Sequence, residues 1–164
     1  MSDSHDAAVP PTEETPPISV NIPIHDLLGL EFEAPEEGSM KAEVRMPVRP
    51  GAFGFTANLH GGAIATLVDV ACALAAARST GFDPLTQSLV TADMHVRYLG
   101  RPRTAWVIAR SQVVKAGKQL IVVNCKVVDE DDHVIASADF SMMLVALRPS
   151  LDGGPATTSG APEL

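Results

Sequence analysis

The first candidate for chemistry is a single carboxylate in an apolar segment. Between Gly61 and Ala77, Asp69 is the only charged residue, and Thr66 is the only other clearly polar one. An ionised carboxylate that is buried without partners is strongly unfavourable. Asp69 must therefore be paired, hydrogen-bonded, protonated or close to solvent. Two interpretations follow: a structural carboxylate satisfied by its neighbours, or a reactive group at a site.

The tripeptide directly before this segment, His60-Gly61-Gly62, is the second candidate. Glycines at the start of a helix leave backbone N–H groups uncovered, and the helix dipole adds partial positive charge there. Such a turn suits a developing oxyanion. A Gly-Gly pair before a helix is nevertheless more often only a turn, and a lone histidine more often orients a loop.

The spacing of the two candidates carries information. Asp69 follows Gly61 by eight residues, which is about 12 Å along a helix at roughly 1.5 Å per residue. One helix therefore cannot present both groups to one carbonyl. Two antiparallel helices could, if the amides of one chain faced the carboxylate of another. The spacing predicts a symmetric dimer with two composite sites.

One long helix, predicted over residues 62–78, must carry these groups. Its two sides differ, and small residues on one side would permit the close approach of another subunit. The bulky side, which we expect to face a sheet, comprises Ile64, Leu67, Val68, Ala71 and Leu74. The small side comprises Gly62, Ala65, Thr66, Asp69, Cys72, Ala73 and Ala76.

Strands surround this helix in the sequence. A short helical turn over 24–28, ended by Gly29, precedes a strand over 41–48 and a loop over 49–58. Four further strands are predicted over 88–99, 104–114, 119–129 and 134–147. They predict an antiparallel meander with one apolar face, which the helix covers. In the strand over 88–99, alternation places Thr91, Asp93, His95 and Arg97 on a polar second face.

Composition limits the class of protein. The 164 residues suffice for one domain, which we expect over 21–148. Residues 1–20 are acidic and rich in Pro, residues 149–164 are rich in Pro, Gly, Ser and Thr, and both tails are expected to be disordered. The net charge is -8, yet residues 41–148 contain twelve Lys and Arg against nine acids. The domain can therefore receive an anionic ligand.

Several other classes have little support. Cys72 and Cys125 lie in apolar surroundings without metal-ligand spacing, so we interpret them as buried free thiols and expect no metal site. No secretory signal is evident, and the longest apolar stretch is too short and too polar for a membrane span. Aromatic residues are only 4% of the chain, which argues against nucleic-acid binding. A reduced, cytoplasmic protein is expected.

Three stretches together resemble a known family. The segments NLHGGAIATLVDVA, VTADMHVRYLGRPR and VVKAGKQLIVVNCKVVDEDDHVIASA resemble those of hotdog-fold acyl-CoA thioesterases, particularly the phenylacetate-pathway subfamily. The resemblance covers roughly residues 40–147, and its most specific element is HGG with an Asp nine residues after the His. It implies an α+β hotdog fold, in which a five- to six-stranded antiparallel sheet wraps a long central helix.

The resemblance also implies roles for particular residues. Asp69 would act as nucleophile or general base on a thioester, and the Gly61 amide would polarise its carbonyl beside His60. Thr91 looks like the family's Ser or Thr that hydrogen-bonds the acid or a water. The implied partners are an acyl-CoA substrate and a second copy of the chain, with a dimer of dimers beyond it. Coenzyme A is then part of the substrate, and no separate cofactor is expected.

Coenzyme A phosphates need cations, and five lie in strand ends and turns: Arg97, Arg101, Arg103, Lys115 and Lys118. Any one of them could equally be a solvated turn charge. The family commonly has an Asn six residues before the His, where this chain has Gly54, and Asn58 is a possible substitute. This departure keeps a second hypothesis open, a non-catalytic acyl-CoA-binding or partner-binding module. An acyl-CoA hydratase has less support, because no Asp and His pair has the spacing of such enzymes.

Overall fold

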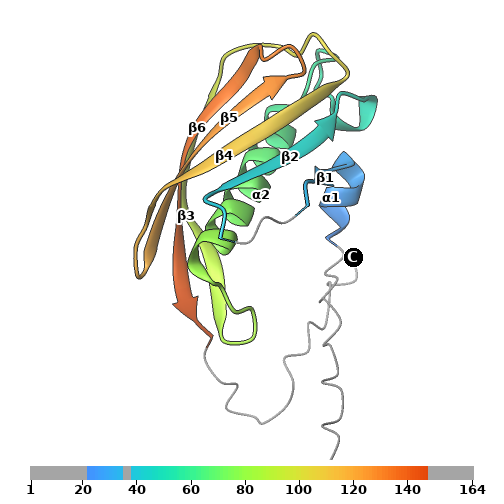
Figure 1. Ribbon diagram of the computed structural model, residues 1–164. Coiled ribbons are helices and arrows are strands. Elements are labelled where there is room, and N and C mark those ends of the chain that lie inside the picture. Colours follow the sequence, from blue (N-terminus) through green and yellow to red (C-terminus); the bar gives the residue numbers. More distant parts are fainter. Residues whose placement is uncertain (1–21, 35–37, 148–164) are drawn as a thin grey trace, which may run out of the picture.

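The computed structural model describes residues 22–34 and 38–147 and contains six strands and two α-helices within these ranges (Figure 1). The predicted tails over 1–20 and 149–164 lie outside the described residues. In chain order the elements are α1 (Pro23–Leu28), β1 (Glu31–Phe32), β2 (Lys41–Pro47), a 3-10 turn (Pro50–Ala52), α2 (Gly61–Thr80), β3 (Gln87–Tyr98), β4 (Trp106–Ala116), β5 (Leu120–Asp129) and β6 (Val134–Ala146).

The strands form one antiparallel sheet in the order β1-β2-β4-β5-β6-β3. The sheet curls around α2, which packs against β2, β4, β5, β6 and β3 (Figure 1). The predicted α+β architecture, a long helix wrapped by an antiparallel sheet, is confirmed. Short β1 is the sixth strand, at the edge beside β2.

The strand order corrects one expectation. β4, β5 and β6 form the predicted meander, but β3 pairs with β6 at the far edge and not with β4. The connection after β3 therefore crosses the end of the β5–β6 hairpin to reach β4. Leu99 N–H donates to Ile135 O at 2.9 Å, and Arg103 N–H donates to Asp129 Oδ2 at 3.0 Å. The place beside β4 belongs to β2.

α2 supplies the centre of the core. Leu67, Val68 and Ala71 of the predicted bulky side are completely buried, and this burial stabilises the helix in the sheet. The expectation that this stretch is too short and too polar for a membrane span was wrong by length and composition, because α2 passes both criteria. Here, however, the helix packs within the sheet. The division into two sides was partly wrong. Cys72 and Ala76, expected on the small side, are buried by the curled sheet.

A strip of α2 stays accessible in the single chain. Its partly exposed residues are Ala65, Thr66, Asp69, Val70, Ala73, Leu74 and Ala77. Most have small side chains, and they recur every three or four residues, which places them along one side of the helix. Leu74, expected to face the sheet, belongs to this strip.

α1 lies near the start of α2 rather than on the sheet face (Figure 1). Pro23 occupies its first turn, where a missing N–H costs nothing. The helix ends at Gly29, whose φ of 67° is left-handed, as the sequence predicts. The Arg49 guanidinium donates to Leu27 O at 2.9 Å and so ties the end of α1 to the loop before α2.

Candidate active site

The first turn of α2 is organised by His60. This residue caps the helix, and its Nδ1 accepts a hydrogen bond from Gly62 N–H at 2.8 Å. A Cβ on residue 62 would lie 2.9 Å from that Nδ1, so glycine is required for this cap. Because Nδ1 is the acceptor, the neutral ring carries its proton on Nε2. The Gly62 amide is thereby already engaged.

The Gly61 amide, in contrast, is available. Gly61 is the first helical residue, so its N–H has no acceptor within the helix, and it donates to no other group among the described residues. Its carbonyl accepts a hydrogen bond from Tyr98 Oη at 3.1 Å. A single free N–H at the positive end of a helix can stabilise a carbonyl oxygen that gains negative charge.

A pocket of about 260 Å³ opens beside Gly61. The 99–105 connection forms one wall, through Arg101 and Pro102, and the loop before α2 forms another. The remaining lining residues are Thr56, Asn58, Leu59, Ile64, Tyr98 and Gly100. The pocket thus combines a lining of polar and apolar side chains with Arg101 and one free amide.

Asp69 lies two turns further along α2 and is partly exposed. Its Oδ1 accepts a hydrogen bond from Thr91 Oγ1 on β3 at 2.9 Å. No other hydrogen bond or ion pair reaches its carboxylate from the described residues. The carboxylate is therefore oriented by one hydroxyl and retains free lone pairs, as a nucleophile or a general base requires.

Thr91 faces the helix because β3 contains a bulge. The register with β6 shifts directly after Thr91. Thr91 pairs with Met142 and Met94 pairs with Phe140, and both partners are buried. Residues three apart point to opposite faces of a regular strand, but the extra residue, Ala92, restores the same face. The alternation that placed Thr91 on the polar outer face was therefore wrong.

A second pocket, of about 200 Å³, lies on the other side of the first turn of α2. It separates α1 from α2 and is mostly apolar. Its walls come from α1 and the 50–53 turn on one side and from α2 on the other: Ile24, Leu27, Leu28, Gly51, Ala52, Phe53, His60, Gly62, Ala63 and Thr66. It runs along α2 to within one turn of Asp69.

The five predicted cations lie apart from one another on the single chain. Arg97 pairs with Asp139 at 2.9 Å, and only Arg101 lines the pocket beside Gly61. Lys118 lies at the opposite end of α2, in a hollow with Ser79 and Thr80. Two further members occupy separate positions on the exposed surface, Arg103 after β3 and Lys115 near the end of β4.

In the structure the side-chain amide of Asn58 is already hydrogen-bonded, and one residue that was not predicted joins the site. Asn58 lines the pocket, but its Nδ2 donates to Thr56 O at 2.9 Å and to Thr56 Oγ1 at 3.2 Å. Its amide hydrogens are thus used within the loop. The added residue is Tyr98 at the end of β3, whose hydroxyl contacts Gly61. The feature of the sequence that could have drawn attention to Tyr98 is that the chain has no other tyrosine.

The two cysteines are buried and free. A hydrogen bond with Cys125, together with burial, raises the pKa of the Cys72 thiol far above its ordinary value. Cys72 therefore stays protonated and is unsuited to nucleophilic attack. Among the described residues no group of three or more His, Cys, Asp or Glu side chains could hold a metal.

Comparison with known proteins identifies the family. The model of the thioesterase superfamily matches residues 56–136, which include His60, Gly61 and Asp69. A medium/long-chain acyl-CoA thioesterase, YigI of Salmonella typhimurium, is 33% identical over 136 residues, covering 76% of this chain and 86% of that protein. The chain belongs to the thioesterase superfamily. The predicted class of enzyme, a thioester hydrolase, is confirmed at the level of this family.

Solved structures similar to this chain agree on the fold. A Bacillus halodurans protein, solved with CoA, is 30% identical with a TM-score of 0.58 and covers 63% of this chain and 66% of that one. The PaaI protein of the Escherichia coli phenylacetic acid degradation operon is 22% identical with a TM-score of 0.66, covering 76% and 86%. The predicted hotdog fold is confirmed.

Proposed function

We propose that this thioesterase hydrolyses an acyl-CoA to a free carboxylic acid and coenzyme A. The observation that carries the proposal is the carboxylate of Asp69, which Thr91 orients through one oxygen and leaves open at the other. The free Gly61 amide supplies the complementary group, a donor for the thioester oxygen. The name of the Salmonella relative, 33% identical, supports the same substrate class.

Asp69 can act in either of two ways. As a nucleophile, its oxygen adds to the thioester carbon, the C–S bond breaks, and coenzyme A leaves as a thiolate that takes up a proton. Water then hydrolyses the resulting mixed anhydride. As a general base, Asp69 instead takes a proton from the water that attacks the carbonyl. In both routes negative charge develops on the carbonyl oxygen, where Gly61 N–H would donate.

The site needs two copies of the chain. Gly61 and Asp69 are about 12 Å apart along one helix, and Asp69 does not line the pocket beside Gly61. Two features favour a homodimer: the accessible small-residue strip of α2 and the free edge of β3, which pairs only with β6 among the described strands. An open edge of twelve residues invites pairing with a second sheet.

The two pockets suit the two halves of the substrate. The pocket with Arg101 would receive the coenzyme A part, because its guanidinium can bind phosphate. The apolar pocket between α1 and α2 would receive an aliphatic acyl chain, with Leu27 and Phe53 as its walls. The thioester would then lie at the turn between them, beside Gly61.

Release of free thiol tests this function. We expect turnover of medium- and long-chain acyl-CoA in a screen that also contains short-chain and aryl-acyl CoA, in a buffer free of reductants. Asp69→Asn should remain folded and dimeric and lose turnover. Unchanged hydrolysis by the folded Asp69→Asn variant would exclude the proposed role of this residue.

A second candidate function rests on Gly54. A binding module for acyl-CoA, without hydrolysis, is favoured by the absence of the amide that family members commonly place there. Acyl-CoA that binds tightly without thiol release would support it. A Cβ on residue 54 would lie 3.4 Å from the His60 ring, which is ordinary contact. A Cβ is therefore tolerated at this position, and Gly54→Asn should raise turnover if the missing amide limits the rate.

A further inference from the structure

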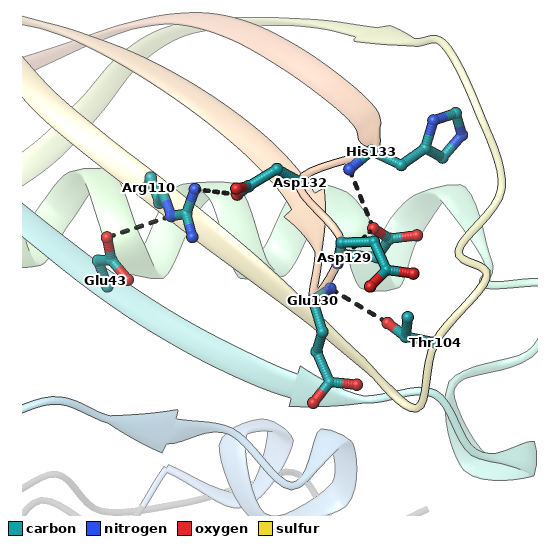
Figure 2. A network of polar contacts seen from close by, with 8 residues as sticks. Glu43, Thr104, Arg110, Asp129, Glu130, Asp132 and His133 are labelled. Carbon is teal, nitrogen blue, oxygen red and sulfur yellow. Dashed lines mark hydrogen bonds and ion pairs between the residues drawn. The ribbon is translucent and has the colours of Figure 1, made fainter.

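A second carboxylate, remote from Asp69, holds a wall of the Gly61 pocket. Asp129, at the end of β5, is 0% exposed. Its Oδ1 accepts hydrogen bonds from Asp131 N–H at 3.1 Å and His133 N–H at 3.0 Å, which close the β5–β6 turn. Its Oδ2 accepts Arg103 N–H at 3.0 Å. Figure 2 shows Asp129 within this polar network.

The bond to Arg103 anchors the connection between β3 and β4. The other end of this connection is anchored at Gly100, whose N–H donates to Ile135 O at 3.1 Å. Beside Arg103, Thr104 Oγ1 accepts Glu130 N–H at 3.1 Å (Figure 2). The β5–β6 hairpin therefore holds both ends of the 100–104 segment.

Close packing restricts this segment further. A Cβ on residue 100 would lie 2.8 Å from Val134 O, so the backbone of Gly100 rests directly on the hairpin. Between the two anchors lie Arg101 and Pro102, which form one wall of the pocket. The position of Arg101 thus depends on contacts made by its neighbours on both sides.

Arg101 itself has an unengaged guanidinium. It makes no hydrogen bond or ion pair with any residue in ranges 22–34 and 38–147, in contrast to Arg97, which pairs with Asp139. An exposed cation with a fixed backbone beside a pocket is ready to meet an anion, because less conformational freedom is lost on binding.

We propose that Asp129 is a positioning residue for coenzyme A: through Arg103 N–H it fixes the 100–103 segment so that Arg101 meets the phosphate groups. The proposal rests on the proposed function, since it takes the anion to be that of the substrate. Asp129 does not touch the substrate. It affects binding indirectly, because it holds the backbone between Arg103 and Arg101 in place.

The test compares binding of coenzyme A with hydrolysis of two thioesters. For Asp129→Asn we expect the Kd of coenzyme A, measured by calorimetry, and the KM of acyl-CoA to rise about 3- to 10-fold, while kcat changes less than about twofold. The KM of a thioester with the same acyl group on N-acetylcysteamine, which lacks phosphates, should not change.

Asp132→Asn is the matched control. Asp132 lies in the same turn, but its carboxylate pairs with Arg110 on β4 and does not contact the 100–104 segment (Figure 2). We expect no change in either Kd or KM. Arg101→Gln should raise the Kd of coenzyme A. In the double variant, Asp129→Asn should raise this Kd little further.

Two outcomes would overturn the proposal: equal changes in KM for both thioesters, or additive effects of the Asp129 and Arg101 substitutions. If Asp129→Asn does not fold, Gly100→Ala, which must displace the same segment, should weaken coenzyme A binding, and unchanged binding would also overturn it. The binding measurement needs no turnover. If the wild-type protein binds coenzyme A but hydrolyses no thioester, the proposed function is contradicted and the role of Asp129 in binding is not.

Discussion

Asp69, on the apolar helix α2, and Asp129, at the end of β5 beside a polar turn, are carboxylates with opposite environments. Asp129 is fully buried, and three backbone N–H groups satisfy its oxygens. Asp69 is partly exposed and accepts one hydrogen bond, from Thr91. A carboxylate whose two oxygens are both engaged holds backbone in place, whereas one with a free oxygen can react. The functional difference lies in the number of hydrogen-bond partners of each carboxylate.

The largest expected effect is the fall in kcat when Asp69 is replaced, and it distinguishes a reactive acid from a structural one. Asp69→Asn should lower kcat by about 10²- to 10⁴-fold, the range of a positioned acid or base, without lowering the melting temperature. The asparagine keeps the size of the side chain and can still accept from Thr91. Steady-state kinetics and thermal unfolding of the same preparation measure both quantities. A large drop in melting temperature would make Asp69 a structural residue like Asp129.

Next in size is the loss of the oxyanion donor. Gly61→Pro removes the N–H at a helix position where proline is tolerated, and His60, with φ of -64° and ψ of 136°, already has the conformation that precedes proline. We expect kcat to fall about 10²- to 10³-fold. Gly61→Ala keeps the N–H and serves as the control in the same assay. Equal losses in both variants would assign the effect to packing against Tyr98.

A smaller effect should follow from removing the partner of Asp69. Thr91→Val keeps the shape of the side chain and deletes the hydroxyl, so the carboxylate loses its orienting hydrogen bond. We expect kcat to fall roughly tenfold, which corresponds to about 1.4 kcal/mol. Thr91→Ser retains a hydroxyl and should keep most of the activity. Full activity of Thr91→Val would show that Asp69 needs no orienting group.

The smallest effect concerns stability in acid. Burial raises the pKa of Asp129, but the N–H groups of Arg103, His133 and Asp131 outweigh it and hold the pKa below its ordinary value. A lowered pKa in the folded state stabilises the protein above the unfolded pKa of about 3.9, and this contribution is lost as the pH falls through the folded value. We expect a melting temperature several degrees lower for Asp129→Asn at pH 7, with the difference narrowing below pH 4.

Thermal unfolding of wild type and Asp129→Asn between pH 3 and pH 7 measures this change. Asp132→Asn is the control, because that exposed side chain pairs only with Arg110 in the described part of the chain. If the difference in melting temperature between wild type and Asp129→Asn is constant across this pH range, the charge of the carboxylate does not contribute to stability.

The sequence predicted the parts of this site that are local. The HGG turn, the long helix and the apolar setting of Asp69 follow from neighbouring residues, and their spacing predicts a second chain at the site. The role of Asp129 could not be predicted, because DEDDH reads as a charged turn. Its partner Arg103 becomes adjacent only when β3 takes the far edge of the sheet.

Two further features escaped prediction for the same reason. The bulge at Ala92, which turns Thr91 inward, depends on the pairing of β3 with β6 and leaves no mark on the alternation of residues. The five cations look like one cluster in the sequence, but Arg101 and Lys118 lie at opposite ends of α2. Long-range strand pairing decides both, and a single sequence does not reveal it.

The central claim is that Asp69 of one subunit acts with Gly61 of another. Mixing Asp69→Asn and Gly61→Pro chains under conditions that exchange subunits tests it directly. A mixed dimer would contain one site with both native groups, so random assortment of inactive parents should restore about a quarter of wild-type activity. If both groups instead acted within one chain, no chain in the mixture would be intact, and activity would stay at the level of the parents.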